Sequence, residues 1–153
     1  MKPLFLWLLL VATTFLASCS SSHKPATSGA IPPARTPISL AGTGWVLTDL
    51  AGTPALPGGK ATLVFPESGR VAGSGSCNRF TGAVTITADA LKIGQLASTR
   101  MACADESVSK QEDAYLKALG GATRYSYQDP YLLIYCEGFD KPLRFVRATP
   151  SKP

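Results

Sequence analysis

The chain of 153 residues is poor in histidine, with His23 alone, and has only two tryptophans, two methionines and 16% charged residues. A single histidine excludes most catalysis and metal binding that depend on clustered imidazole groups. Lys and Arg number 15 against 10 Asp and Glu, but they are scattered without a basic run, which argues against nucleic-acid binding. With 45% hydrophobic residues, the chain suits one modest globular domain and is too apolar for a disordered protein.

Residues 1–18 have the layout of a secretory signal peptide. A basic Lys2 precedes an apolar run over residues 4–12, and small residues end the segment. Two threonines at 13 and 14 interrupt the apolar run, which falls short of the ~20 residues that a membrane-spanning helix needs. We therefore expect export and cleavage rather than a transmembrane anchor.

The signal ends in Leu16-Ala17-Ser18-Cys19, which resembles a bacterial lipobox. This resemblance implies that Cys19 receives lipid and becomes the first residue of the mature chain, so that the protein contacts the membrane through its N-terminal lipid. Ser20 at the next position favours the outer membrane, and we expect the domain to face the periplasm. The alternative is ordinary cleavage beside a chance cysteine.

The remaining chain divides into a tether, a domain and a tail. The tether, residues 19–39, is rich in Pro and Ser and has no acid and no aromatic residue, so it cannot form a core. Short alternating apolar runs cut by turn residues then fill residues 40–148, and residues 149–153 form a C-terminal tail.

The alternation within residues 40–148 predicts eight strands and one helix. The strands are expected near 44–50, 60–66, 70–76, 83–88, 90–95, 123–128, 131–136 and 142–147. This order predicts an α+β domain, in which a curved antiparallel sheet or incomplete β-barrel of about eight strands buries one face against a helix inserted after the fifth strand.

The helix is expected between Asp105 and Leu119. Apolar side chains at 108, 115, 116 and 119 fall on one side, which leaves Glu112 and Asp113 on the polar, solvated surface. Ser109 and Glu112 have the spacing of a capping box, Asp105 is an earlier capping candidate, and two glycines follow as a stop signal.

Two motifs in a fixed order carry a family resemblance. The stretch Gly73-Ser-Gly-Ser-Cys-Asn-Arg-Phe-Thr-Gly82, followed by Leu96-Ala-Ser-Thr-Arg-Met-Ala-Cys103 and then the helix, resembles the META domain of HslJ-like bacterial proteins. Ser76 stands where members of this family often have glycine or another residue. The resemblance implies a small envelope domain of mixed α/β fold, linked to heat shock and antibiotic tolerance, with no established enzymatic activity and no implied cofactor.

Lipidation of Cys19 would leave three cysteines, enough for one internal disulfide and one thiol. Cys77 and Cys103 are the preferred pair, since both lie in the matched motifs and the periplasm is oxidising. Cys136 alternates with apolar residues along a strand and is expected to be a buried thiol. A reactive Cys77 is the rival interpretation, but it needs a nearby base, and no histidine remains in the domain.

Two further groups are candidate contact sites. Asn78, Arg79, Thr99 and Arg100 flank the paired cysteines and are expected to form a polar network or an anion site. Tyr125, Tyr127, Tyr131 and Tyr135 are expected to face one another across a hairpin, and they become a contact surface if that side of the sheet is uncovered.

The sequence therefore predicts a non-enzymatic outer-membrane lipoprotein that acts in envelope maintenance or stress tolerance by binding another envelope component, either an envelope protein or an apolar ligand. One alternative is a small barrel that holds a lipid or another apolar ligand in a cavity beneath the helix. A second alternative is an inhibitor of a periplasmic hydrolase, which requires a protruding loop. No metal or cofactor is expected.

Overall fold

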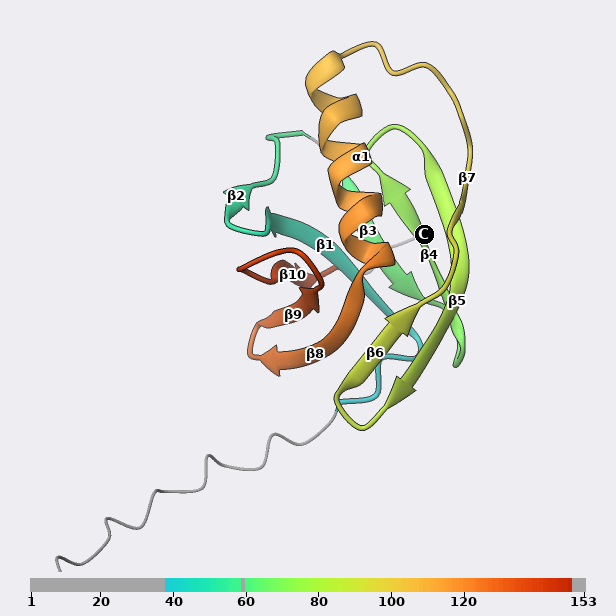
Figure 1. Ribbon diagram of the computed structural model, residues 1–153, viewed down its shortest axis with the longest axis vertical. Coiled ribbons are helices and arrows are strands. Elements are labelled where there is room, and N and C mark those ends of the chain that lie inside the picture. The colour runs from blue at the N-terminus through green and yellow to red at the C-terminus, as the bar shows by residue number, and fades with distance from the viewer. Residues whose placement is uncertain (1–37, 59, 150–153) are drawn as a thin grey trace, which may run out of the picture. The chain divides into compact units, whose positions relative to one another are not determined.

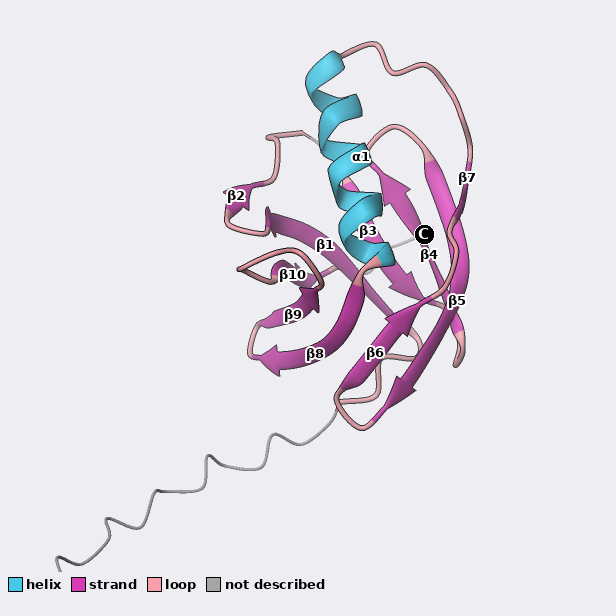
Figure 2. Cartoon of the chain, in the orientation of Figure 1, coloured by secondary structure: helices cyan, strands magenta, loops and turns pink. Residues whose placement is uncertain are grey.

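The computed structural model describes residues 38–58 and 60–149 (Figure 1, Figure 2). The predicted signal, Cys19 and nearly all of the tether lie outside the described residues. The strands are β1 (Thr43–Leu50), β2 (Thr53–Pro54), β3 (Ala61–Phe65), β4 (Arg70–Gly75), β5 (Arg79–Thr87), β6 (Ala90–Ile93), β7 (Ala97–Ser98), β8 (Ala122–Gln128), β9 (Tyr131–Cys136) and β10 (Leu143–Arg147), and the helix is α1 (Glu106–Gly120). All eight predicted strands and the helix are therefore present, with the two-residue strands β2 and β7 added.

The eight longer strands form a closed antiparallel β-barrel, so the expected incomplete barrel was wrong. Around the barrel the order is β10, β9, β8, β6, β5, β4, β3 and β1, and β1 pairs again with β10. Val46 lies opposite Val146 at this last pairing and opposite Thr62 of β3, so β1 is bonded along both edges. The domain is mostly β rather than α+β, with one helix after the fifth long strand.

Alternation along the strands sends one set of side chains into the barrel. In β1, Trp45 and Leu47 are buried, and in β3 the same holds for Ala61, Leu63 and Phe65. Apolar side chains from the other long strands complete a single core cluster. The barrel interior is thus a packed core.

Helix α1 packs against this core, and Figure 1 shows it crossing in front of β3 and β4. Asp105 caps it, because its side chain accepts hydrogen bonds from the N–H and the hydroxyl of Ser107, which lower the pKa of the Asp105 carboxyl. The alternative capping box at Ser109 and Glu112 was wrong, since the helix has already begun at Glu106. Within the described residues, no helix has the length and apolar character to cross a membrane.

Candidate functional site

The central feature of the site is a buried carboxylate on α1, where the sequence predicted a solvated one. Glu112 is only 5% exposed and points into the turn that joins β4 to β5. Its Oε2 accepts hydrogen bonds from the backbone N–H of Cys77 at 3.0 Å and of Asn78 at 2.6 Å, and its Oε1 accepts one from Asn78 Nδ2 at 2.6 Å. Three N–H donors compensate for the lost hydration of the carboxylate, and no Lys or Arg among the described residues pairs with it.

Asn78 connects this carboxylate to the segment after β7. Its Nδ2 also donates to the carbonyl oxygen of Met101 at 3.3 Å. Its Oδ1 accepts from the Met101 N–H and from Thr99 Oγ1, both at 2.8 Å. The Asn78 amide therefore uses two donor and two acceptor positions, which is the full capacity of that group.

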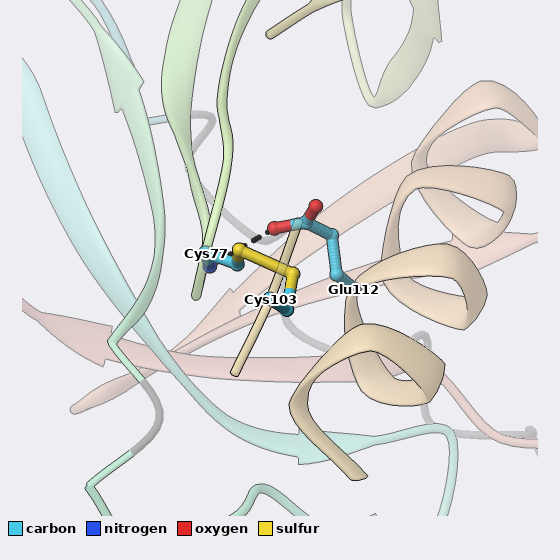
Figure 3. Close-up of side chains that lie close together, drawn as sticks. All are labelled: Cys77, Cys103 and Glu112. Atoms are coloured by element: carbon cyan, nitrogen blue, oxygen red, sulfur yellow. Dashed lines mark hydrogen bonds between the residues drawn. A yellow bond between two sulfur atoms is a disulfide. The ribbon is translucent and has the colours of Figure 1, made fainter. Parts of the chain in front are cut away.

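The expected disulfide between Cys77 and Cys103 is present and ties the same two segments together, with the Cα atoms 5.9 Å apart. Figure 3 shows it beside the Glu112 carboxylate, whose hydrogen bond to Cys77 is drawn as a dashed line. It closes a loop of about 27 residues, which in the chain-entropy model stabilises the fold by ~3 kcal/mol. The disulfide and the hydrogen bonds of Asn78 thus join the same two segments, the β4–β5 turn and the segment after β7.

The two sulfurs and a Glu112 oxygen lie within 4.8 Å of one another, a spacing seen in metal sites. The sulfurs are bonded to each other, however, and are not thiolate ligands. Both carboxylate oxygens are already engaged by N–H groups. With the disulfide formed, the cluster serves to link the β4–β5 turn, α1 and the segment after β7.

Backbone geometry around the turn explains two motif residues. A Cβ atom added at Gly75 would lie 2.5 Å from Cγ of Glu112, so only glycine permits this approach of the helix. Ser76 has a φ of +111°, a conformation that favours glycine. The Ser76 hydroxyl accepts a hydrogen bond from Gln111 Nε2 at 3.1 Å, which offsets part of this strain.

The structure brings Asn78 and Thr99 into the expected polar network, but not the two arginine side chains. Arg79 joins it only through its backbone: its N–H donates to Thr99 Oγ1 at 3.1 Å, and its carbonyl accepts from the Thr99 N–H at 3.0 Å. Arg79 and Arg100 are exposed, and neither side chain forms a hydrogen bond or ion pair with another described residue. The two guanidinium groups are therefore open to an external ligand.

Arg79 borders two shallow grooves near β7. One has a volume of about 640 Å³ and is lined by Lys60, Thr62, Ser74, Ser76, Cys77, Arg79, Thr99 and Met101. The other, of about 410 Å³, is lined by Arg79, Phe80, Thr81, Ala97, Ser98 and Thr99. The grooves share Arg79 and Thr99, and neither lining contains an acidic residue.

The four tyrosines do not face one another, which corrects the expected cross-strand cluster. Tyr125 and Tyr127 lie opposite Ile134 and Leu132, whereas Tyr131 and Tyr135 lie opposite other β8 residues. The side chain of Tyr125 is 5% exposed and the ring of Tyr127 packs edge-on against Trp45, so neither forms an open surface. Tyr131 and Tyr135 instead stack with Arg144 and Arg124 on the outside of the barrel.

Beneath the helix, the place of a ligand cavity is occupied by Tyr115. Its ring is fully buried, lies 6.0 Å from the ring of Phe80 and 6.2 Å from that of Phe145, and its hydroxyl donates to the Thr62 carbonyl. The Cys136 thiol is buried, and desolvation raises its pKa to about 12. This packing gives no support to a ligand-holding barrel and leaves Cys136 without the low pKa of a reactive thiol.

Sequence reasoning missed Glu112 and Met101 as site residues. Glu112 lies four residues after Val108 and three before Tyr115, which places it on the apolar stripe of the helix. A charged residue on that stripe was the available signal. Met101 is 62% exposed and bonded to Asn78 through its backbone, and no local pattern distinguishes that arrangement.

The comparisons with known proteins agree with this architecture. A family model described as META domain matches residues 38–150. An NMR structure of a protein from Burkholderia xenovorans is 30% identical, with a TM-score of 0.59, and the match covers 72% of this chain and 84% of that one. A second protein solved by NMR is 25% identical over 70% of this chain and 90% of its own, with a TM-score of 0.57.

A crystal structure of a DUF4847 family protein from Bacteroides vulgatus shares the fold at 15% identity. Its TM-score is 0.51, and the match covers 73% of this chain and 96% of that one. No curated protein matches the chain.

Proposed function

Because the chain belongs to the META domain family, we propose that it is a non-enzymatic envelope lipoprotein whose domain binds another envelope component. The proposed anchor is Cys19 in the outer membrane, with the domain facing the periplasm, and the proposed role is envelope maintenance under heat or antibiotic stress. The lipobox, the signal layout and the tether support this location.

One observation carries the binding role: the polar groups of the site are engaged in holding an exposed segment in place. Glu112, Asn78 and the disulfide all act on residues 77–78 or 99–103. Residues 97–102 are all exposed, and Met101 is 62% exposed. A segment whose conformation is fixed by the rest of the domain, and whose outer side is exposed to solvent, suits recognition of a partner.

Site-specific photo-crosslinking in the intact envelope tests the binding role. A benzophenone side chain at Ser98 is expected to give a reproducible adduct, and the same group at exposed Lys117 on α1 is the matched control. Absence of an adduct specific to Ser98, under normal growth and under heat or antibiotic stress, would overturn the proposal.

Labelling with a fatty-acid analogue tests the anchor. The wild-type chain is expected to incorporate the label, and Cys19→Ala is expected to lose it. Cys136→Ala is the control, since Cys136 is buried in the core. Equal labelling of the Cys19→Ala chain would contradict the proposed lipidation.

Inhibition of a periplasmic hydrolase is a second candidate, favoured by the same exposed and fixed segment. An inhibitor loop must keep its shape in a cleft, and the Asn78 amide together with the disulfide supplies that restraint. Arg100 would then be the residue presented to a peptidase that prefers basic side chains. Titration of trypsin-like peptidases should show stoichiometric inhibition that Arg100→Ala abolishes, whereas rapid cleavage after Arg100 would reject this role.

A further inference from the structure

We propose that the segment from Ala97 to Met101 is a docking edge for an extended acidic polypeptide, which binds by adding a strand beside β7. This inference rests on the proposed binding function and gives the chemical class of the partner. Strand addition requires an edge with free backbone groups, a fixed conformation and side chains that select the partner.

The segment meets the first requirement, free backbone groups along one edge, because the backbone N–H groups of Thr99 and Met101 both point toward β5 and Asn78. Thr99 donates its N–H to the Arg79 carbonyl at 3.0 Å, and Met101 bonds through both its N–H and its C=O to the Asn78 side chain. Asn78 thus continues the ladder of β5 with its side-chain amide in place of a backbone peptide. Since peptide groups alternate along a strand, the N–H and C=O of Ser98 and Arg100 point the other way.

That outward edge has no strand beside it in the described part of the chain. Strand β7 pairs with β5 alone, and Figure 1 shows it along the outer side of the barrel, away from α1. No hydrogen bond to the backbone of Arg100 is formed by any residue that the structure describes. Unpaired groups of this kind form a ready template for another chain.

The second requirement is met because the edge is held in its strand-like form before any partner arrives. The Glu112 carboxylate fixes the turn that carries Asn78, and the disulfide fixes the far end at Cys103. Ordering entropy that is already lost in the free protein does not weaken binding.

Charge selects the partner. The two grooves beside the edge carry Lys60 and Arg79 without an acid, and Arg100 adds a third exposed cation within the edge. The tether of this chain is basic and has no acid, so it does not complement these charges. An acidic strand of another molecule does, and the exposed Met101 side chain offers it an apolar contact.

The test uses the full chain in detergent micelles and a fluorescein-labelled octapeptide of alternating Val and Glu, read by fluorescence anisotropy. Methylating the backbone nitrogens of the peptide that would face the edge should weaken binding at least ~10-fold, because the backbone hydrogen bonds of those nitrogens are lost. A Val and Lys octapeptide should not bind. Equal binding of the methylated peptide, or no binding of the Val and Glu peptide at millimolar concentration, would overturn the proposal.

Variants of the protein separate backbone pairing from charge. Arg100→Pro removes the outward N–H together with the cation, whereas Arg100→Ala removes only the cation, so the proline variant should bind at least ~5-fold more weakly than the alanine variant. Lys117→Ala is the matched charge control and should bind like the wild type. Equal affinities of the proline and alanine variants would contradict strand addition.

If Arg100→Pro does not fold, Arg79→Ala tests the contribution of charge, and the methylated peptide tests the contribution of backbone pairing. The Ser98 crosslink separates failure of the acidic-strand proposal from failure of the proposed binding function. A persistent crosslink together with a failed peptide test would overturn only the acidic-strand proposal, whereas failure of both tests would also overturn the binding function.

Discussion

Two regions of the domain, the polar cluster around Glu112 and the β8–β9 hairpin, use their distinctive residues in opposite ways. Around Glu112, polar side chains are buried so that a neighbouring segment stays exposed in a fixed shape. In the β8–β9 hairpin, Tyr125 is buried for packing, and the outer tyrosines are covered in part by stacked arginines. A group of tyrosines that stands out in the sequence is therefore a weaker guide to the site than a charged residue at a position where helical periodicity predicts an apolar one.

Of the substitutions that test this contrast between the polar cluster and the hairpin, removal of the Glu112 carboxylate is expected to have the largest effect. Glu112→Ala leaves three N–H donors unsatisfied, and we expect the free energy of unfolding to fall by about 4 kcal/mol. Urea denaturation measures this loss, and exposed Asp113→Ala is the control, with a change below about 0.5 kcal/mol. Similar stability of the Glu112→Ala and wild-type chains would show that the buried polar cluster is dispensable.

Loss of the disulfide should come next. Cys77→Ser combined with Cys103→Ser is expected to lower the free energy of unfolding by ~3 kcal/mol through the entropy of the unfolded chain. Hydrogen exchange at the Thr99 and Met101 amides should accelerate beyond the increase that the lower global stability causes in β8 and β9. Uniform acceleration over the barrel would indicate that the bond supports the whole core rather than this segment.

A smaller loss is expected from Gly75→Ala, because the added Cβ would meet Glu112 at 2.5 Å. We expect the free energy of unfolding to fall by about 2 kcal/mol, since backbone and helix must move apart. Gly120→Ala is the matched control, since nothing lies within 4 Å of its added Cβ, and it should be neutral or slightly stabilising. Equal thermal midpoints for the two variants would refute the close approach.

Ser76→Gly sharpens the comparison in the other direction. Glycine removes the cost of the positive φ at this position, and we expect a net stabilisation of about 1 kcal/mol after loss of the hydrogen bond from Gln111. The thermal midpoint measures it. A lower midpoint would mean that the bond from Gln111 outweighs the backbone strain.

The smallest effect is expected at the hairpin surface. Tyr131 is 37% exposed and stacks with Arg144 at 5.2 Å, so Tyr131→Ala should change the free energy of unfolding by less than about 1 kcal/mol. It should also leave crosslinking from Ser98 unchanged. Loss of the crosslink in this variant would move the contact surface to the hairpin.

The sequence predicted the eight long strands and the helix because alternation and helical periodicity are local patterns. Barrel closure depends on pairing between β1 and β10, about 100 residues apart, and no local pattern encodes that register. The disulfide was expected from its motifs, whereas burial of Glu112 was missed because its charge was given more weight than its position on the apolar stripe. The roles of Met101 and the Asn78 amide arise only from long-range contacts.

The most direct test of the account is amide hydrogen exchange measured by NMR at Arg100 and Met101. We expect the Met101 amide to be protected by Asn78 Oδ1 and the Arg100 amide to exchange freely, and Asn78→Ala to abolish the protection at Met101 alone. Equal exchange at both amides in the wild type, or unchanged Met101 protection in Asn78→Ala, would contradict the claim that buried polar groups hold this edge open for a partner.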